Sequence, residues 1–242
     1  MATNRIALVT GANKGIGLEI ARQLAQVGAT VIIGARDAER GNAAVADLSA
    51  HGLAATFVQC DVVDEGSIAS AAAAISDRHG RLDILVNNAG IMDWTDSVPS
   101  SASLQAVRRV FETNFFGALA VTQAMLPLLR KSTAARVVNM SSALGSLAGN
   151  GDPTSPYYSA QLIGYNASKA ALNMLTIQLS QEFRGTPHVV NSVSPGFVKT
   201  DLTGGNGFLT ADQAAKTPVK FALLGDDAVS GQFVKSDGEI AW

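Results

Sequence analysis

The feature that most constrains the fold is a repeated alternation of short apolar runs with segments of helical periodicity. The apolar runs span residues 6–9, 30–36, 54–58, 82–86, 136–140 and 189–193, with a last short one near 232–234. Runs that are apolar on both faces are typical of strands covered by helices on each side, as in a parallel sheet. The alternation therefore predicts an α/β fold of three layers, a right-handed, doubly wound parallel sheet with helices on both faces and ligands at the carboxyl ends of its strands.

Length and composition favour a single domain over residues 1–242. Of the 242 residues, 47% are hydrophobic and 16% charged, which is enough for a large core. The net charge of -2 argues against nucleic-acid binding, and no apolar stretch approaches the length of a membrane span. The single cysteine, Cys60, excludes an internal disulfide, and the three histidines have no ligand partner at useful spacing, so no metal site is expected. We expect a soluble, cytoplasmic protein.

A glycine-rich turn joins the first apolar run to the first helical segment. Residues 10–17 read Thr-Gly-Ala-Asn-Lys-Gly-Ile-Gly, after which Ile20, Leu24 and Val27 recur at helical spacing. In the order strand, glycine turn, helix, such glycines let the backbone approach a pyrophosphate, whose charge lies at the helix N-terminus. The turn therefore predicts a dinucleotide site, with a purely structural tight turn as the alternative.

Charges at the ends of the second and third runs bear on which dinucleotide binds. The second run ends in Arg36, where an NAD site would carry an acidic residue, and a guanidinium suits the 2′-phosphate of NADP. Lys14 in the glycine turn would add a second positive contact. Asp37 follows directly, so a solvated strand end is the alternative for Arg36. Asp61 closes the third run, either beside the adenine amino group or as the N-cap of the next helix.

A tyrosine and a lysine four residues apart form a candidate catalytic pair. Tyr165 opens a helical segment that extends to about Phe183, so Lys169 lies on the same helix face. An ammonium near the phenol stabilises the phenolate and lowers the pKa of the tyrosine, which would make the pair a general acid and base. Asn114, which lies among apolar residues of the helical stretch 104–129, needs hydrogen-bond partners if it is buried.

Six motifs follow one another along the chain. They are Thr10-Gly11-x-x-x-Gly15-x-Gly17, Asn87-Asn88-Ala89-Gly90, Asn114, Ser142, Tyr165-x-x-x-Lys169 and Pro195-Gly196-x-Val198-x-Thr200. With these motifs in this order, the chain resembles the classical short-chain dehydrogenase/reductase family over nearly its whole length. The resemblance implies a Rossmann fold, NADP(H) as cofactor, and an oxidoreductase that interconverts a ketone or aldehyde with an alcohol.

The resemblance also implies roles for single residues. Tyr165 would donate a proton to the substrate carbonyl, and Lys169 would lower the pKa of Tyr165 and contact the nicotinamide ribose. Ser142, rather than Ser141, would bond the carbonyl oxygen, and Asn114 would anchor a water in a proton relay behind Lys169. Val198 and Thr200 would hold the carboxamide, and Asn87 would pack with Gly90 near the adenosine. The full cofactor set is Gly11, Asn13, Lys14, Gly15, Ile16, Gly17, Arg36, Asp61, Val62, Asn88, Ala89, Gly90, Tyr165, Lys169, Pro195, Gly196, Val198 and Thr200.

One departure from the family concerns the segment before Tyr165. Ser142 and Tyr165 are 23 residues apart, more than is common in the family. The extra segment, residues 148–163, resembles the insertion of the carbonyl-reductase-like branch, some members of which are monomers because it covers the usual subunit interface. Here it is shorter, so we expect a homo-oligomer, a dimer or tetramer, with a monomer as the alternative. Residues 200–220 would form a mobile substrate loop, and Trp94 is a candidate for the substrate pocket.

Two other functions compete with carbonyl reduction. A reductase of carrier-bound 3-oxoacyl groups would need a positive patch beside the cleft for an acidic carrier protein. A sensor that binds NADP(H) without turnover would have no need to keep the phenol, hydroxyl and ammonium together. The substrate itself is expected to be a small carbonyl or alcohol whose identity the sequence leaves open.

Overall fold

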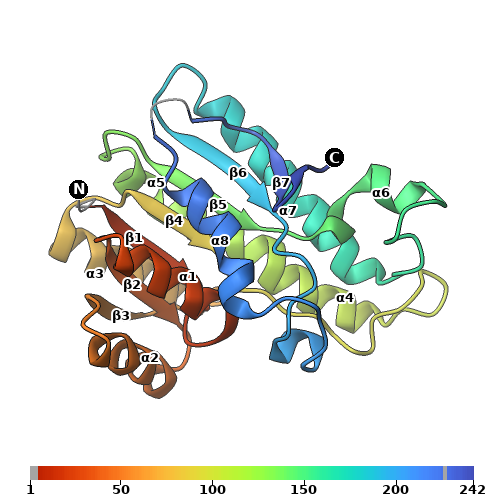
Figure 1. Cartoon of the computed structure of the whole chain (residues 1–242), viewed down its shortest axis with the longest axis horizontal. Helices are drawn as coiled ribbons and strands as arrows, with labels where there is room; N and C mark the ends of the chain where they lie inside the picture. The colour runs from red at the N-terminus through yellow and green to blue at the C-terminus, as the bar shows by residue number, and fades with distance from the viewer. Residues whose placement is uncertain (1–4, 226–227) are drawn as a thin grey trace.

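An eight-stranded sheet forms the centre of the computed structural model, which describes residues 5–225 and 228–242 (Figure 1). Its strand order is β3-β2-β1-β4-β5-β6-β7-β8. Neighbours from β3 through β7 are parallel, and β8 runs antiparallel to β7. The strands are β1 Ile6–Thr10, β2 Thr30–Ala35, β3 Ala55–Gln59, β4 Ile84–Asn87, β5 Arg136–Met140, β6 Val189–Val193, β7 Phe233–Lys235 and β8 Gly238–Glu239. The parallel, doubly wound sheet predicted from the sequence is confirmed.

Helices cover both faces of the sheet. One layer contains α1 (Gly15–Gln26), α2 (Ala38–Ala50) and α8 (Ala211–Ala222). The other contains α3 (Glu65–His79), α5 (Ala118–Leu129) and α7 (Ile163–Glu182). Figure 1 shows α1 and α8 beside each other on the near side of the sheet. Shorter elements are α4 (Leu104–Phe111), α6 (Leu147–Gly151) and the 3-10 turns Ala143–Gly145 and Asp201–Thr203.

Alternation along each strand explains why the strands are apolar throughout. In β1, Ala7 and Val9 join the core beneath the α1 layer, whereas Ile6 and Leu8 join the core beneath the α3 layer. Successive side chains of a strand point to opposite faces, and both faces of this sheet are covered. A continuous apolar run is therefore what each central strand requires.

The strand order reverses at β1 and β4, and this reversal positions the candidate site. The glycine turn leaves β1 at the same edge at which residues 88–90 leave β4. The Thr10 hydroxyl accepts hydrogen bonds from the backbone N–H groups of Asn88 and Ala89, at 3.0 and 3.1 Å. The Asn88 amide in turn donates to the Thr10 carbonyl at 2.8 Å. These bonds fix the two loops against each other at the crevice where doubly wound sheets bind ligands.

Several elements differ from the sequence predictions. The helical stretch 104–129 is interrupted by a π-helix, Glu112–Gly117, which joins α4 to α5. The segment between Ser142 and the predicted catalytic helix contains the 3-10 turn and α6. Helix α3 is capped by Asp64, whose carboxylate accepts from the N–H groups of Gly66 and Ser67, so the N-cap alternative for Asp61 is wrong.

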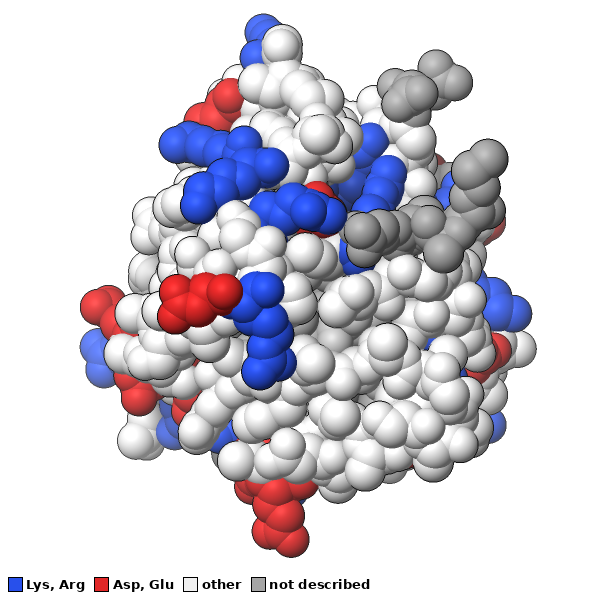
Figure 2. Space-filling model, turned by 90° about the vertical axis from the view of Figure 1, so that its left-hand side faces the viewer, with Lys and Arg blue, Asp and Glu red and all other residues white. Residues whose placement is uncertain are grey.

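The strands begin at the opposite edge of the sheet, where several helices also end. Figure 2 looks onto this side and shows basic side chains gathered in its upper part. Positive residues at this edge are Arg5, Arg78, Arg81, Arg130, Lys131 and Arg184. Positive charge is favourable beside the carbonyl ends of helices, which gives these residues a structural role. Among the described residues, no helix is both long and apolar enough to cross a membrane.

Candidate active site

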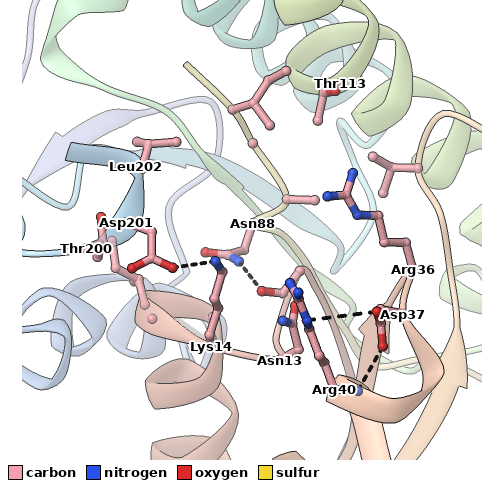
Figure 3. Close-up of a pocket in the computed structure, with 18 of the residues that line it drawn as sticks. Asn13, Lys14, Arg36, Asp37, Arg40, Asn88, Thr113, Thr200, Asp201 and Leu202 are labelled. Atoms are coloured by element: carbon pink, nitrogen blue, oxygen red, sulfur yellow. Dashed lines mark hydrogen bonds and ion pairs between the residues drawn. The ribbon is translucent and has the colours of Figure 1, made fainter. Parts of the chain in front are cut away.

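A groove of about 630 Å³ lies where the glycine turn, β2 and β4 end (Figure 3). Its walls contain most of the residues that the sequence assigned to a cofactor, together with Arg40, Thr113, Lys199, Asp201 and Leu202, which the sequence reasoning missed. The assigned residues lining it are Gly11, Asn13, Lys14, Gly15, Ile16, Gly17, Arg36, Asp61, Val62, Asn88, Ala89, Gly90 and Thr200. Residues from distant parts of the chain therefore converge on one elongated site.

The backbone of the glycine turn leaves an anion-binding helix end open to the groove. Gly11 and Gly15 have φ angles of 63° and 60°, a left-handed conformation that glycine adopts without strain. Lys14, the N-cap residue of α1, makes no side-chain cap bond, and the first turn of the helix holds no acidic residue. The first N–H groups of α1 are thus free to bind a phosphate, with the helix dipole favouring its negative charge.

Basic side chains cluster at one part of the groove, where Figure 3 shows Lys14, Arg36 and Arg40 around it. Lys14 forms an ion pair with Asp201, and this pair lowers the pKa of the Asp201 carboxyl. Asp37 caps α2 by accepting from the backbone N–H of Arg40 at 2.9 Å. One oxygen of the Asp37 carboxylate is used in this cap, and the first charged side chain after β2 is Arg36, where an NAD site would carry an acidic residue.

Tyr165 and Ser142 are in contact beside the groove, although neither they nor Lys169 are among the residues that line it. Tyr165 lies in the first turn of α7 and is buried, and burial raises the pKa of its phenol to about 12. A hydrogen bond with the Ser142 hydroxyl acts in the opposite direction and lowers this pKa. Ser141 is buried and its hydroxyl has no hydrogen-bond partner in the described part of the chain, so the geometry favours Ser142 as the serine of the site.

Lys169 lies one helical turn beyond Tyr165, as its spacing predicts. Its ammonium is 5.7 Å from the centre of the Tyr165 ring and donates to the Met140 carbonyl at 2.8 Å. Burial lowers the pKa of Lys169 to about 8. The sequence predicted that Lys169 would lower the pKa of Tyr165; in the structure Lys169 is not among the causes of its shift, and desolvation of the phenol raises the pKa.

The π-helix brings the Asn114 side chain close to Gly90 and Lys169. Its side-chain oxygen accepts from the Ile91 N–H at 2.8 Å, and its amide donates to the Ile91 carbonyl and the Ser168 hydroxyl. A Cβ atom added to Gly90 would lie 3.3 Å from the Asn114 oxygen and 3.4 Å from the Lys169 nitrogen. Glycine at position 90 therefore leaves the space between these two groups open, which suits a water-mediated connection between them.

Some assigned residues lie elsewhere. Asn87 points into the protein and donates to Thr122 and Asn139, and it is not among the residues lining the groove in which it was predicted to pack with Gly90. Pro195, Gly196 and Val198 follow β6 but are not among the residues lining the groove, and Val198 is buried against Leu209. No group of acidic, histidine or cysteine side chains in the described residues is arranged to hold a metal ion.

The apolar side chain of Trp94 borders the groove beside the segment that the sequence predicted as a substrate loop, the second half of which forms α8. Trp94 lines the groove, and a Cβ added to Gly204 in the loop would lie 3.7 Å from its ring. Phe197 and Phe208, which do not line the groove, form an edge-on ring pair with their centres 5.7 Å apart.

Comparison with known families decides what kind of protein has this site. A family model described as short chain dehydrogenase matches residues 5–207. The chain belongs to the short chain dehydrogenase family. This short chain dehydrogenase is 37% identical over 229 aligned positions to short-chain dehydrogenase anuI of Penicillium roqueforti, with 92% of this chain and 90% of that protein covered.

Two further relatives carry the name carbonyl reductase. The short chain dehydrogenase is 34% identical over 283 aligned positions to carbonyl reductase [NADPH] 1 of Sus scrofa, covering 100% of this chain and 96% of that protein. The crystal structure of NADPH-bound carbonyl reductase from chicken fatty liver superposes with a TM-score of 0.86 at 31% identity, with both chains covered fully. The resemblance seen in the sequence, including its carbonyl-reductase-like branch, is confirmed.

Proposed function

We propose that the protein is an NADPH-dependent oxidoreductase that reduces a ketone or aldehyde carbonyl to an alcohol, reversibly. The observation that carries this proposal is the meeting of Ser142, Tyr165 and Lys169 beside Gly90, which lines a basic, glycine-walled groove. The family and the NADPH-binding relatives support it. The homo-oligomer expected from the sequence stays a prediction.

The residues of the groove fit a phosphorylated dinucleotide. The open N-terminus of α1 would hold the pyrophosphate, and Arg36, with Lys14 and Arg40 near it, would hold the 2′-phosphate. When bound, NADPH supplies the hydride. The protein supplies orientation and hydrogen bonds to the carbonyl oxygen, on which negative charge develops.

Tyr165 would act as the proton donor to that oxygen. With a pKa of about 12 the phenol is fully protonated at neutral pH, so it can donate. An alkoxide-like oxygen is a far stronger base than a phenolate, so the proton transfer remains favourable despite the raised pKa. Ser142 would donate a second hydrogen bond, and Lys169, which is largely charged at pH 7, would stabilise the phenolate once the proton has left.

The proposal is tested by following oxidation of NADPH and NADH at neutral pH with a panel of ketones and aldehydes, beside Tyr165→Phe. We expect turnover that prefers NADPH and a fall in kcat of roughly 10²–10⁴ in the variant, the usual contribution of a general acid. Tight NADPH binding with no turnover by the native protein across the panel would contradict the proposal and favour the sensor.

The choice of NADPH is tested separately with Arg36→Asp. Loss of the guanidinium and gain of a carboxylate should weaken NADPH binding far more than NADH binding, because NADH has no 2′-phosphate. Dissociation constants for both cofactors, measured by titration, give the answer. An equal loss of affinity for NADPH and NADH would show that Arg36 does not bind the 2′-phosphate.

The rival function of reducing carrier-bound acyl groups gains no support from the charge distribution. That function predicts a positive patch beside the cleft, whereas the basic gathering in Figure 2 lies at the edge where the strands begin. The groove itself mixes Lys14, Arg36 and Arg40 with Asp37 and Asp201.

A further inference from the structure

Helix α7 carries both Tyr165 and Lys169, yet its own sequence provides no cap for its N-terminus. The N-cap residue Leu162 has an apolar side chain that cannot accept a hydrogen bond. Uncapped first turns fray, because their N–H groups lack partners within the helix. Tyr165 stands in this first turn, so its position depends on what those N–H groups bind.

A segment nearly 70 residues earlier in the chain provides the missing acceptors. The Asp96 carboxylate accepts from the backbone N–H of Gly164 at 3.0 Å through one oxygen and from that of Tyr165 at 2.8 Å through the other. The neighbouring Ser97 carbonyl accepts from the N–H of Ile163 at 3.1 Å. The first three N–H groups of α7 are thus all bonded to residues 96 and 97.

The Asp96 carboxylate is buried and held from several sides. Its residue is 6% exposed, and the oxygen that meets Gly164 also accepts from the Ser97 N–H at 2.9 Å. A Cβ added to Gly164 would lie 3.1 Å from Asp96 and 3.1 Å from the backbone of Val107 in α4. Only glycine at position 164 lets the carboxylate and α4 approach the helix end this closely.

We propose that Asp96 is a positioning residue, whose buried carboxylate fixes the first turn of α7 and thereby holds the Tyr165 phenol against Ser142. The proposal rests on the proposed function of Tyr165 as proton donor. Lys169 lies one turn deeper and has its own anchor in the Met140 carbonyl. Loss of the Asp96 contacts therefore shifts Tyr165 relative to a Lys169 and a cofactor groove that stay in place.

The chain offers a matched control in Asp64, which caps α3. There one carboxylate oxygen accepts both N–H bonds, so an asparagine oxygen replaces it fully. At position 96 both oxygens accept, so an asparagine would turn its NH₂ group toward an N–H donor whichever way its amide is oriented. Asp96→Asn therefore breaks the cap, whereas Asp64→Asn preserves one of the same type.

The experiment measures kcat, KM and the NADPH dissociation constant for Asp96→Asn and Asp64→Asn. We expect kcat to fall about 10- to 100-fold in Asp96→Asn, the cost of a misplaced catalytic group, with NADPH affinity unchanged. Asp64→Asn should match the native protein in all three. A native kcat in Asp96→Asn, or an equal loss of NADPH affinity, would overturn the proposal.

A double variant with Tyr165→Phe distinguishes positioning from a general structural effect. If Asp96 acts through the phenol, Asp96→Asn should lower the residual activity of Tyr165→Phe little further. The same fold-loss in both backgrounds would overturn the proposal. Should Asp96→Asn fail to fold, Gly164→Ala provides a second route, because its added methyl displaces the carboxylate and should lower kcat in the same way.

A readout without turnover keeps this proposal separate from the proposed function. The amide hydrogen of Tyr165 should exchange with solvent faster in Asp96→Asn than in the native protein, because it has lost its acceptor. Faster exchange in a protein that reduces no carbonyl would leave the cap standing and refute the enzyme. Unchanged exchange in Asp96→Asn, together with carbonyl reduction by the native protein, would refute the role of Asp96 and leave the proposed function standing.

Discussion

Two buried side chains of α7, Tyr165 and Lys169, carry opposite pKa shifts from the same cause. Desolvation disfavours the charged form of each group, so the pKa of the phenol rises to about 12 and that of the ammonium falls to about 8. At neutral pH the phenol is uncharged and suffers no penalty, whereas the lysine is still protonated. Burial of the charged Lys169 therefore lowers the stability of the fold, whereas burial of the neutral Tyr165 phenol does not.

Replacing this lysine should stabilise the fold. A shift from 10.5 to about 8 corresponds to about 3 kcal/mol, and the lost bond to Met140 offsets part of that, so we expect Lys169→Met to gain about 2 kcal/mol at pH 7 while losing activity. Below pH 8 both folded and unfolded states hold the proton, and the full penalty is present. Between about pH 8 and pH 10.5 the unfolded state binds the Lys169 proton more than the folded state does, so the stability of the native protein rises with pH. The difference in stability between Lys169→Met and the native protein therefore shrinks over this range.

Urea unfolding of both proteins at pH 7 and pH 9.5 checks this, since both values lie below the range in which Tyr165 titrates differently in the two states. A smaller advantage of the variant at pH 9.5 is the expected result. An advantage that did not change with pH would mean that packing, rather than the buried charge, sets the difference.

Among the elements, α2 has an N-cap residue, Asp37, that also lines the proposed cofactor groove. Asp37 caps the helix, and its second carboxylate oxygen lies 3.9 Å from the guanidinium of Arg40, which lines the groove. Asp37→Asn keeps the cap oxygen but removes the negative charge beside Arg40. We expect NADPH to bind about two- to fivefold more tightly, since the pair is exposed, with little change for NADH.

Titration of both cofactors against the native protein, Asp37→Asn and the α3 cap variant Asp64→Asn measures this. The α3 variant removes the same charge from a helix cap outside the groove. A gain for NADH equal to that for NADPH, or a gain in the control, would show that Arg40 does not meet the 2′-phosphate.

The elements also show what the sequence can and cannot predict. Strand positions were predictable because helices cover both faces of the sheet, which forces runs such as 136–140 to be apolar throughout. The groove residues were predictable because glycines and charges stood at strand ends. Asp96 and Arg40 were not predictable, because each meets residues that are distant in the sequence and come close only in the folded protein. Their neighbours in the sequence form no motif. The π-helix at Asn114 likewise leaves no periodic signal.

On the scale of the whole molecule, the two ends of the strands have different roles. The loops proposed to bind the cofactor gather where the strands end, while Arg136 joins several segments at the edge where the strands begin. Its buried guanidinium donates to the carbonyls of Leu224, Gly225 and Pro187 at 2.8 to 2.9 Å, and to those of Ala134 and Ala135. Segments from three distant parts of the chain thus share one cation.

Arg136→Met should therefore destabilise the protein without touching its site. Buried carbonyls left without a donor should cost about 3 kcal/mol of unfolding free energy, while the NADPH dissociation constant should stay within about twofold of native. Denaturant unfolding and cofactor titration measure the two quantities. Arg130→Met, which loses an exposed pair with Glu182 at 4.0 Å and a weak repulsion with His188, is the control and should change neither. Weaker NADPH binding in Arg136→Met would contradict the separation of the edges.

The packing of α1 against α8 sets the order in which the protein can be completed during synthesis. Ala21 and Leu24 of α1 share a core with Ala215 and Val219 of α8, and the Gln23 amide donates to Asp212. In the chain, α8 follows α1 by nearly 200 residues. During synthesis α1 therefore exposes an apolar stripe until α8 has been made, and the helix that follows the glycine turn is fully packed only then.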